Sequence, residues 1–523
     1  MNDELNLQMF KAYDIRTVST KLNKENTERL LRSVAKYYLD VIKTDSLVIG
    51  RDARLAAPSL MQAAVDMFPL YGLNVILNPL QVSTCQFYYS CMQNRKSGGI
   101  MFTASHNPGV YIGLKLLAPN METLAMGCGA QGGITAIKQF YIENVKPSFA
   151  KQRGKVIIKR YLDEFIDYSL SYAGVEKDSL KGSKILTDYL SGAVGTEMSE
   201  ALSYAGADLR SRNLIPDGYF PQGDPNPIVI SSVQKTWDLM KSGNFDFGFC
   251  FDGDGDRMDV MYKTGVQIAP CFNMAALMGD LKKIYKKIYE SGFYGKDVPF
   301  NPHSYADVKA NPLAMVQMAK AGVDIHIIRN GHSFIKQALT ANCKNQYMGA
   351  SEESAHYYLN FPYDLKDYSK GFASTENTLF FTLLTSKIWV QHPEVFDKIM
   401  ETQEKIYRER EWPLFFKDES KMEESLKRVE KYFTNEGLSC FKEMEDKSSL
   451  DATILRYGLP EIIKPETDLS GEWYQIAQRI SRSEDGIARW ELVGSKKDLV
   501  KKATEKIKEI NQVYVDEKKA NYL

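Results

Sequence analysis

Two short stretches of this sequence place potentially reactive side chains directly after apolar runs. In the first, TASHNPG, the side chains of Ser105, His106 and Asn107 follow the apolar run SGGIMF. Three interpretations are open: Ser105 is a hydrolase nucleophile with His106 as its base, Ser105 carries a covalent group, or the corner is an ordinary turn. The turn is a real alternative because Ser, Asn, Pro and Gly are the residues that turns commonly use.

The second stretch, FDGDGDRMDV, carries carboxylates at alternate positions. Asp252, Asp254 and Asp256 follow an apolar strand, and the glycines between them allow the backbone to fold until the carboxylates converge. Convergent carboxylates repel one another unless a cation lies among them, and hard oxygen ligands suit Mg²⁺ or Ca²⁺. A solvated acidic turn is the alternative. An EF-hand calcium loop is excluded because its sixth and twelfth positions would be glycine and glutamate, where this sequence has Arg257 and Lys263.

The serine corner and the aspartate loop could together form one reactive site. A phosphoryl group on Ser105 would carry charge that needs neutralising, and one of its oxygens could complete the coordination of a Mg²⁺ ion held by the three aspartates. The sequence therefore favours a phosphorylated serine next to a magnesium site.

Alternating strands and helices must position these residues. The runs SLVIGRD, LNVILNP and GGIMFTAS indicate strands separated by amphipathic helices, and the same alternation returns in KILTDYL, FDFGFCFDGDGDR and VDIHIIRNGHSFIK. Such repeats predict parallel sheets covered on both faces. After about residue 400 the charged segments METQEKIYRERE and KDESKMEESLKRVEKYF indicate exposed helix or linker, before a lysine-rich C-terminal helix.

We therefore predict an α/β protein of four domains. A chain of 523 residues is too long for one core, since domains usually have roughly 100 to 200 residues. Three consecutive α/β domains with mixed or parallel sheets are followed by a smaller C-terminal α+β domain. The predicted bounds are 1–150, 151–265, 266–400 and 401–523.

Composition limits the possible partners. The 66 basic and 66 acidic residues cancel, so charge gives no argument for binding nucleic acid or an anionic membrane. The seven cysteines show no CxxC spacing, the first residues do not resemble a signal peptide, and no stretch approaches the roughly 20 apolar residues of a membrane span. We expect a cytoplasmic monomer or homodimer without nucleic-acid or membrane partners.

One nucleotide-binding motif is a false match. GCGAQG satisfies G-x-G-x-x-G, but the residues before it do not indicate a strand and no acid stands about 20 residues beyond it. No G-x-S-x-G or G-x-x-x-x-G-K-[ST] motif occurs either, which weakens the hydrolase and P-loop alternatives.

Motifs along nearly the whole chain resemble those of the α-D-phosphohexomutases, in the phosphomannomutase and phosphoglucomutase group. TASHNP, with Lys115 ten residues after its serine, is followed in the family's order by DGDGDR, GHSFIK, EESAH and RISRSEDGIAR, and FKAYDIR matches the opening motif. The resemblance implies reversible phosphoryl transfer between the 1- and 6-positions of a hexose phosphate, through a phosphoserine enzyme and a hexose 1,6-bisphosphate. It also implies that the four domains are arranged around a central cleft, with Mg²⁺ as cofactor, the bisphosphate as activator and a small phosphosugar as substrate.

The resemblance assigns roles around the transferring phosphoryl group. Ser105 would be the phosphoserine and would bind the metal together with Asp252, Asp254 and Asp256. Arg16, Arg257 and His106 would stabilise charge on the phosphoryl group, which is the main electrostatic task in such reactions.

The resemblance also assigns the proton transfers. Lys115 and His332 would move protons to and from the sugar hydroxyls, and His332 suits this because an imidazole titrates near neutral pH. The alternative is a structural histidine, because HSFIK also begins an ordinary amphipathic helix.

Two further loops would bind the substrate without transforming it. Glu352, Ser354 and His356 of ASEESAHYY would contact sugar hydroxyls, although this stretch also fits a helix N-cap. The last loop offers guanidinium and hydroxyl donors to the phosphate that is not transferred. Its members are Arg479, Ser481, Arg482, Ser483 and Arg489. Taken alone, such an arginine cluster would be a solvated surface as often as a site.

Departures from the family pattern leave the substrate open. Thr17, Ile112, Leu114 and Ala355 replace common family residues, and SED stands for TEP in the phosphate loop. None of these changes removes a charged or nucleophilic group, but glucose, mannose and glucosamine phosphates cannot be ranked, and 282–321 matches no family motif.

Two alternative functions remain after the motifs are placed. One is a metal-dependent phosphosugar phosphatase. The other is a non-catalytic, phosphosugar-binding regulatory phosphoprotein, against which the intact Lys115 and His332 argue.

Overall fold

The computed structural model describes residues 5–295, 297–481 and 484–522. The chain divides into two compact units and passes from one to the other several times. Unit 1 comprises Met1–Ala269, His332–Cys343 and Ser354–His392, and unit 2 comprises Pro270–Gly331, Lys344–Glu353 and Pro393–Leu523. The four domain boundaries expected from the sequence stay a prediction.

The first sheet of unit 1 has seven strands, in the order β1-β5-β4-β2-β3-β7 with β6 paired to β5. Strand β2 runs parallel to β3 and β4, whereas β5 runs antiparallel to β4 and β1. The predicted strands SLVIGRD, LNVILNP and GGIMFTAS therefore correspond to β2, β3 and β4. The bounds are β1 Ile15–Val18, β2 Ser46–Arg51, β3 Asn74–Gln81, β4 Gly98–Phe102, β5 Tyr111–Leu117, β6 Thr123–Leu124 and β7 Val156–Ile158.

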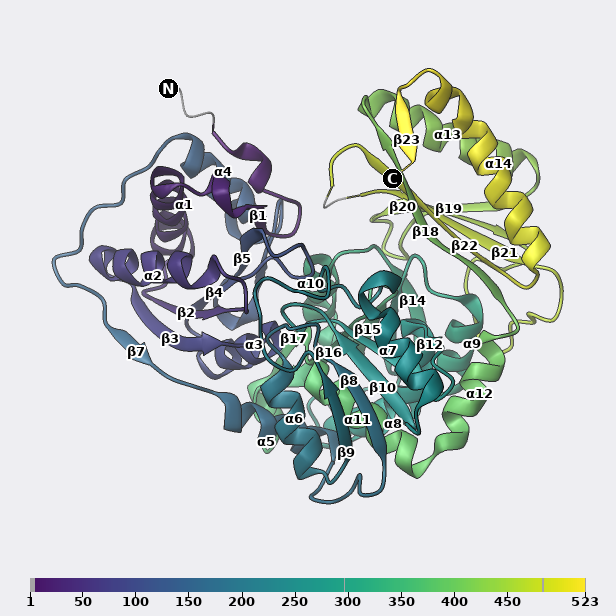
Figure 1. Cartoon of the computed structure of the whole chain (residues 1–523), viewed down its shortest axis with the longest axis horizontal. Coiled ribbons are helices and arrows are strands. Elements are labelled where there is room, and N and C mark those ends of the chain that lie inside the picture. The colour runs from purple at the N-terminus through teal and green to yellow at the C-terminus, as the bar shows by residue number, and fades with distance from the viewer. Residues whose placement is uncertain (1–4, 296, 482–483, 523) are drawn as a thin grey trace. The chain divides into compact units, whose positions relative to one another are not determined.

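Helices cover this sheet through apolar contacts. Figure 1 shows α1 and α2 together along strands β2 to β4, and Leu30 of α1 and Leu60 of α2 belong to the buried core there. On α3, Phe87 and Cys91 pack so closely on Gly99 of β4 that a Cβ at that position would lie 2.8 Å from Cys91 Sγ. The helix bounds are α1 Lys24–Lys36, α2 Ala57–Met67, α3 Thr84–Gln93 and α4 Ile134–Ile142.

The second sheet of unit 1 repeats this arrangement, in the order β12-β11-β10-β8-β9. Strand β8 runs parallel to β9 and β10, and β11 runs antiparallel to β10. In each sheet, one of the parallel strands is therefore followed along the chain by a neighbour that runs antiparallel to it, and the loop between the two carries reactive residues. These loops are 103–110 between β4 and β5, and 252–257 between β10 and β11. The bounds are β8 Lys184–Asp188, β9 Asp208–Arg212, β10 Phe247–Phe251, β11 Met258–Tyr262, β12 Gln267–Ile268, α5 Leu162–Ala173, α6 Gly195–Tyr204 and α7 Ile230–Ser242.

Later segments of the chain complete unit 1 and begin unit 2. In unit 1, β16 and β17 form an antiparallel pair next to two helices of the same unit. In unit 2, β13 runs parallel to both β14 and β15, which is the strand pattern already seen in β2 and β8. The unit 1 bounds are α10 His332–Ala341, β16 His356–Pro362, β17 Phe372–Glu376 and α11 Thr378–Gln391. The unit 2 bounds are α8 Pro270–Glu290, β13 His303–Asp307, α9 Pro312–Lys320, β14 Asp324–Ile328 and β15 Tyr347–Glu352.

The C-terminal part of unit 2 is an antiparallel sheet covered by two helices. Its strand order is β19-β20-β21-β22-β18-β23, and Figure 1 shows α13 and α14 lying along the sheet. Val429 of α13, Ile507 of α14 and Trp490 of β22 are fully buried in the core. The bounds are α12 Pro393–Gln403, β18 Tyr407–Phe416, α13 Glu419–Asn435, β19 Ser439–Glu443, β20 Ser449–Tyr457, β21 Tyr474–Ile480, β22 Ile487–Gly494, α14 Lys497–Asp516 and β23 Ala520–Tyr522.

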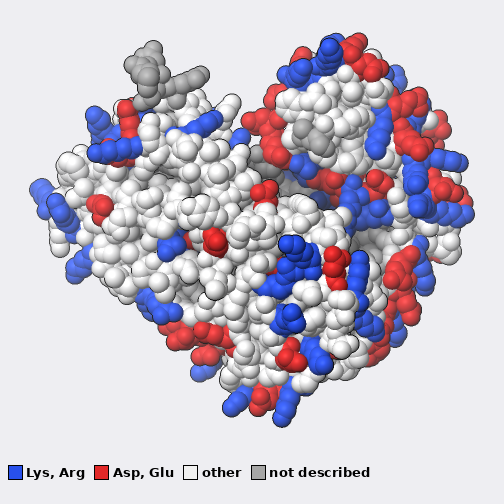
Figure 2. Space-filling model, viewed as in Figure 1, with Lys and Arg blue, Asp and Glu red and all other residues white. Residues whose placement is uncertain are grey.

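Of the two charged segments after residue 400, one forms the expected exposed helix and the other contains a strand. KDESKMEESLKRVEKYF forms most of α13, whose outer surface carries interspersed basic and acidic side chains (Figure 2). YRERE instead begins strand β18, where Arg408 forms ion pairs with Glu353 and Glu491. The charge of Arg408 is tolerated because acidic side chains of two other segments neutralise it.

The predicted class of a multi-domain α/β protein is confirmed by these mixed sheets and their helices. Among the helices that the structure describes, none combines the length and the apolar character needed to cross a bilayer.

Candidate active site

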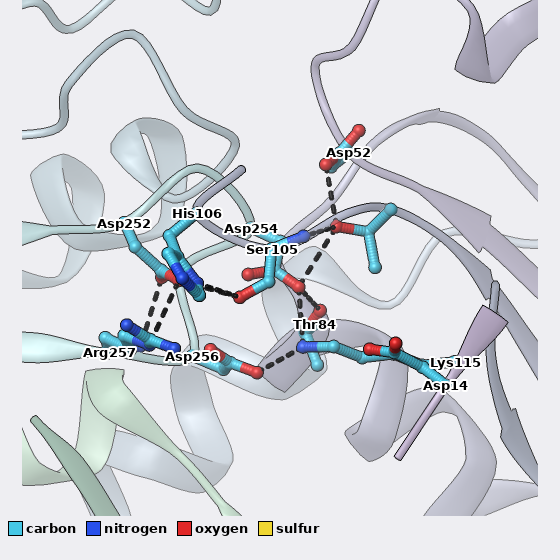
Figure 3. Close-up of polar contacts among 12 residues, drawn as sticks. Asp14, Asp52, Thr84, Ser105, His106, Lys115, Asp252, Asp254, Asp256 and Arg257 are labelled. Carbon is cyan, nitrogen blue, oxygen red and sulfur yellow. Dashed lines mark hydrogen bonds and ion pairs between the residues drawn. The ribbon is translucent and has the colours of Figure 1, made fainter. Parts of the chain in front are cut away.

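The serine loop holds its central residue in a strained conformation. Ser105 is buried and has a φ of +52°, a left-handed region that residues with a side chain seldom adopt. Its N–H donates to Thr103 Oγ1 over 2.9 Å, and its Oγ lies 3.2 Å from His106 Nδ1 and 3.3 Å from Asp252 Oδ2 (Figure 3). The strain persists because the surrounding loop fixes the serine so that its hydroxyl faces the aspartate loop.

The aspartate loop packs directly on the serine loop. Asp252, Asp254 and Asp256 are fully buried, and each offers an oxygen within 4.8 Å of the other two. A Cβ on Gly253 would lie 2.9 Å from the carbonyl oxygen of Ser105, so glycine is needed where the two loops touch. A solvated acidic turn does not fit these buried carboxylates.

The aspartate carboxylates suit a bound cation. Asp254 Oδ1 and Asp256 Oδ1 are buried and have no hydrogen-bond partner among the described residues. Burial, together with the charges of Asp254 and Asp256, raises the pKa of Asp252 well above its usual value. A hard divalent cation would satisfy these oxygens and remove the repulsion, so the donor set fits Mg²⁺.

Lys115 already places a positive charge at this cluster. Its Nζ donates to Asp254 Oδ2 over 2.7 Å and also to Asp256 Oδ2 (Figure 3). Burial lowers the pKa of Lys115, but the two carboxylates outweigh burial and raise the pKa above its usual value. In this arrangement Lys115 is an ammonium group, and it can donate a proton.

Two arginines flank the serine from different elements. Arg16 lies on β1, which pairs with β5, and its Nη1 donates to Asn107 Oδ1 over 2.8 Å. Arg257 ends the aspartate loop, and its Nε lies 3.8 Å from Asp252 Oδ2 and 3.1 Å from His356 Nε2. Both guanidinium groups therefore contact one of the two reactive loops.

Two histidines of the site, His106 and His332, are kept neutral. Burial and then the nearby cations lower the pKa of His106 and of His332 well below the usual value. His332 begins α10 and packs edge-on against Tyr13, with 5.6 Å between ring centroids. Both His332 ring nitrogens are buried and lack hydrogen bonds within the described part of the chain. A neutral imidazole of this kind can accept a proton from a substrate hydroxyl.

The loop expected to contact sugar hydroxyls is divided between the units. Ser354 and His356 belong to unit 1, where His356 Nδ1 lies 3.8 Å from Asp256 Oδ1 and 3.7 Å from Glu376 Oε1. Glu352 belongs to unit 2, where it is buried and accepts the N–H of Gly331 over 2.9 Å. The structure thus brings His356 to the aspartate loop, a contact that the sequence did not indicate.

The described residues of the arginine-rich loop gather around an acid in unit 2. Arg479 and Arg489 are cross-strand partners on β21 and β22, and both bind Glu411 of β18, over 2.8 Å and 3.1 Å. Lys309 Nζ lies 3.6 Å from the same carboxylate. Burial opposes ionisation of Glu411, but these three cations outweigh it and lower its pKa to about 2. Ser481 is also buried.

Arg482 and Ser483, which were also expected in this loop, lie outside the described residues. Lys309 comes from the segment 282–321, in which the sequence showed no motif. Glu411 lacked any signal because it lies in a charged stretch that resembled a solvated surface.

Sequence reasoning also missed several buried polar partners in unit 1. Thr84 and Thr103 place their hydroxyls 2.7 Å and 3.1 Å from Asp254 Oδ2 (Figure 3 labels Thr84). Lys336 and Glu376 form a buried ion pair of 3.1 Å beside His356. The one available signal was Lys336, which follows His332 by four residues and so lies on the same face of α10.

Comparisons with known proteins identify the family. Residues 7–125 match the family model described as phosphoglucomutase/phosphomannomutase, alpha/beta/alpha domain I, and residues 159–265 match domain II of the same family. These matches place residues 7–125 and 159–265 in the phosphoglucomutase/phosphomannomutase family of the α-D-phosphohexomutase superfamily. The resemblance found in the motifs is thereby confirmed.

Individual relatives agree with this assignment. A protein named phosphohexose mutases from Xanthomonas campestris is 27% identical over 69% of this chain and 74% of its own length. A phosphoglucomutase from Neisseria meningitidis is 28% identical over 67% of this chain and 70% of its own length.

Solved structures share the fold. A phosphoglucomutase/phosphomannomutase family protein from Burkholderia thailandensis superposes with a TM-score of 0.74 and 18% identity, covering 99% of this chain and 100% of that one. The open form of pp63/parafusin from Paramecium gives a TM-score of 0.67 and 15% identity, covering 97% and 95%.

Proposed function

We propose that this superfamily member is a phosphohexomutase, which moves a phosphoryl group reversibly between the 1- and 6-positions of a hexose phosphate. The observation that carries the proposal is the packing of the serine loop on the aspartate loop, with Ser105 Oγ 3.3 Å from Asp252 Oδ2. The names of the relatives, phosphohexose mutases, phosphomannomutase and phosphoglucomutase, support this reaction class.

In the proposed cycle, phospho-Ser105 donates its phosphoryl group to a hydroxyl of the bound sugar phosphate. The bond between Ser105 Oγ and phosphorus breaks, a bond from the sugar oxygen to phosphorus forms, and the hydroxyl proton passes to neutral His332. The resulting hexose 1,6-bisphosphate turns over and returns its other phosphoryl group to Ser105. The ammonium of Lys115 gives a proton to Ser105 Oγ when the bond to phosphorus breaks and takes it back when the serine is phosphorylated again. Protonated His332 gives its proton to the released sugar oxygen, so both groups end the cycle as they began.

Charge on the transferring group is the main barrier to such a reaction. Mg²⁺ held by Asp252, Asp254, Asp256 and an oxygen of the phosphorylated serine would neutralise that charge. Arg16 and Arg257 add positive charge, and His106 lies 3.2 Å from the serine oxygen.

The remaining residues are proposed to bind the sugar and its second phosphate. Glu352, Ser354 and His356 would contact ring hydroxyls, and the arginine-rich loop would hold the phosphate that is not transferred. The members proposed for that loop are Arg479, Ser481, Arg482, Ser483 and Arg489. Glucose, mannose and glucosamine phosphates are the candidate substrates, with hexose 1,6-bisphosphate as activator. We further propose a cytoplasmic monomer or homodimer.

The first prediction is that Ser105 carries the phosphoryl group. After incubation with glucose 1,6-bisphosphate and Mg²⁺, intact-mass and peptide spectra should show one added phosphoryl group on Ser105. Ser105→Ala should lose that mass shift and lower kcat more than about 10³-fold, because removing a nucleophile abolishes the covalent route. The matched control is Ser90→Ala, which removes a buried hydroxyl of α3 bonded only to the Gln86 carbonyl oxygen.

A coupled assay on a panel of hexose phosphates separates the alternatives. Isomerised product identifies a mutase, free phosphate identifies a phosphatase, and neither product identifies a binding protein. An unmodified Ser105 together with a fully active Ser105→Ala protein would refute the proposed role of the serine.

A further inference from the structure

A buried arginine outside the recognised motifs binds the serine loop from within. Arg54 follows β2 and is 0% exposed. A guanidinium group has five N–H donors in a fixed fork, and each one in Arg54 has an acceptor. The Nε donates to Asp52 Oδ2 over 3.0 Å. The other four donate to main-chain carbonyls: Nη2 to Ser105 (2.6 Å) and Asn107 (2.7 Å), Nη1 to Pro108 (2.7 Å) and Tyr111 (3.1 Å).

These bonds determine how the serine loop faces the aspartates. Four carbonyl oxygens that converge would repel one another without a cation between them, and residues 104–109 lie outside the strand pairings of β4 and β5. Because a trans peptide is planar, the N–H of His106 points away from the Ser105 carbonyl and therefore away from Arg54. The guanidinium thus sets the orientation of the peptide that follows the reactive serine.

The same arginine is linked to the metal-binding loop. Asp52 Oδ2, which accepts from Arg54, lies 2.7 Å from Thr103 Oγ1. That hydroxyl oxygen accepts a hydrogen bond from the Ser105 N–H and lies 3.1 Å from Asp254 Oδ2. Because the hydroxyl has a single proton, it donates to either Asp52 or Asp254 at any one time. Arg54, Asp52 and Thr103 thus form one polar network that reaches both reactive loops. All members of this network belong to unit 1.

We propose that Arg54 is a positioning residue for phosphoryl transfer. By binding four carbonyls of loop 105–111, it holds Ser105 in its left-handed conformation with the hydroxyl facing the aspartates. Arg54 does not touch the substrate. The role in phosphoryl transfer rests on the proposed function, whereas the ordering of the serine loop by Arg54 does not.

The test compares two buried arginines after replacement by lysine. Lysine keeps the charge but has three donors on one nitrogen, so Arg54→Lys cannot bind four carbonyls and Asp52 at once. The matched control is Arg456→Lys in unit 2, because Arg456 is 1% exposed and also donates to two carbonyls, those of Pro460 and Glu461. Both variants should lower the melting temperature.

Two measurements distinguish positioning from a merely structural role. Arg54→Lys should lower kcat about 10²-fold while KM stays within about threefold, because a small misplacement of reacting groups costs that much. In hydrogen exchange, the Ser105, Asn107 and Tyr111 amides, which are bonded to Thr103 Oγ1, Ala104 O and Pro108 O, should exchange at least about tenfold faster. Arg456→Lys should leave both quantities as in the wild type.

Each departure from this pattern overturns the proposal. Wild-type exchange in loop 105–111 of Arg54→Lys shows that the arginine does not hold the loop. Faster exchange with unchanged kcat shows that holding the loop does not matter for transfer. If the wild type turns over no sugar phosphate, the proposed function fails, and the exchange data alone decide whether Arg54 orders the loop.

A second variant covers the case in which Arg54→Lys does not fold. Asp52→Asn keeps the shape of the side chain but removes the charge that orients the guanidinium Nε. It should change kcat and loop exchange in the same directions and by smaller factors. A folded Asp52→Asn protein with wild-type kcat and wild-type exchange would overturn the proposal.

Discussion

The two oxygens of Asp254 have different surroundings. Oδ2 accepts from Lys115 and Thr84, each over 2.7 Å, whereas Oδ1 is buried without a hydrogen-bond partner in the described structure. The protein therefore fixes the carboxylate through one oxygen and leaves the other for a cation. Asp256 shows the same division, since Oδ2 binds Lys115 and Oδ1 has no hydrogen bond to any described residue.

The prediction at the residue scale concerns the metal. Asp254→Asn should weaken Mg²⁺ binding and lower kcat together by about 10²-fold, since metal and catalytic groups commonly contribute that much. Calorimetric titration with Mg²⁺ and turnover measured against Mg²⁺ concentration provide the readouts. Asp238→Asn, an exposed position on α7 outside the site, is the matched control. Full activity of Asp254→Asn in the presence of a chelator would refute the metal-loop interpretation.

At the scale of elements, strand register creates the cationic cluster of unit 2. Arg479 on β21 pairs with Arg489 on β22, and β18 has a bulge between Glu409 and Trp412 on the other side of β22. The register places Glu411 against both guanidinium groups. Because the pKa of Glu411 is lowered to about 2, the carboxylate stays ionised at neutral pH and competes with any phosphate for these cations.

The corresponding prediction is that the arginines bind phosphate in both orientations of the sugar. Arg479→Ala should raise KM about tenfold to hundredfold for 1-phosphate and 6-phosphate substrates alike, because a charge-assisted hydrogen bond contributes roughly 1.5 to 3 kcal/mol. Steady-state kinetics in both directions provide the measurement. Arg428→Ala, which removes the guanidinium of an exposed α13 residue from Tyr514, is the control. An effect confined to one direction would contradict a shared phosphate site.

At the scale of the whole molecule, the net charge of zero does not reveal buried ionisable groups that destabilise the fold. Glu197 on α6 is 2% exposed; its Oε2 accepts from Gln86 over 3.3 Å, and its Oε1 has no hydrogen bond among the described residues. Burial raises the pKa of Glu197 from 4.5 to about 8, so the folded protein holds this carboxyl neutral at neutral pH. The unfolded chain ionises the same group freely, which favours unfolding as pH rises.

Because burial of Glu197 lowers the free energy of unfolding at higher pH, we predict that Glu197→Gln stabilises the protein more at pH 8 than at pH 5. The free energy of unfolding of the wild type should fall relative to the variant as pH rises from 4.5 to about 8. The difference should approach a few kcal/mol, on the order of 1.4 kcal/mol per unit of pKa shift. Denaturant unfolding at pH 5 and pH 8 measures it, with Glu200→Gln on the exposed face of α6 as control. Equal stabilisation at both pH values would show that Glu197 is not held neutral.

Local patterns in the sequence determined the main elements and the reactive loops. Apolar runs bounded by turn residues predicted β2, β3, β4 and β8, because strand burial leaves a periodic signal within a few residues. The motifs at 103–109 and 251–260 predicted that a serine and three aspartates act together, because convergent carboxylates need a cation and a phosphoryl group needs neutralisation. The ordered motifs also identified the family.

Contacts between residues far apart in the chain were decided only by the tertiary structure. Arg54 reaches the carbonyls of a loop about fifty positions later, and Glu411 meets Arg479 and Arg489 across strands. No local periodicity records such contacts, because a buried arginine or glutamate has the same sequence surroundings as a solvated one. The charged segment YRERE begins strand β18 for the same reason: Arg408 pairs with Glu353 and Glu491, and that pairing exists only in the folded chain.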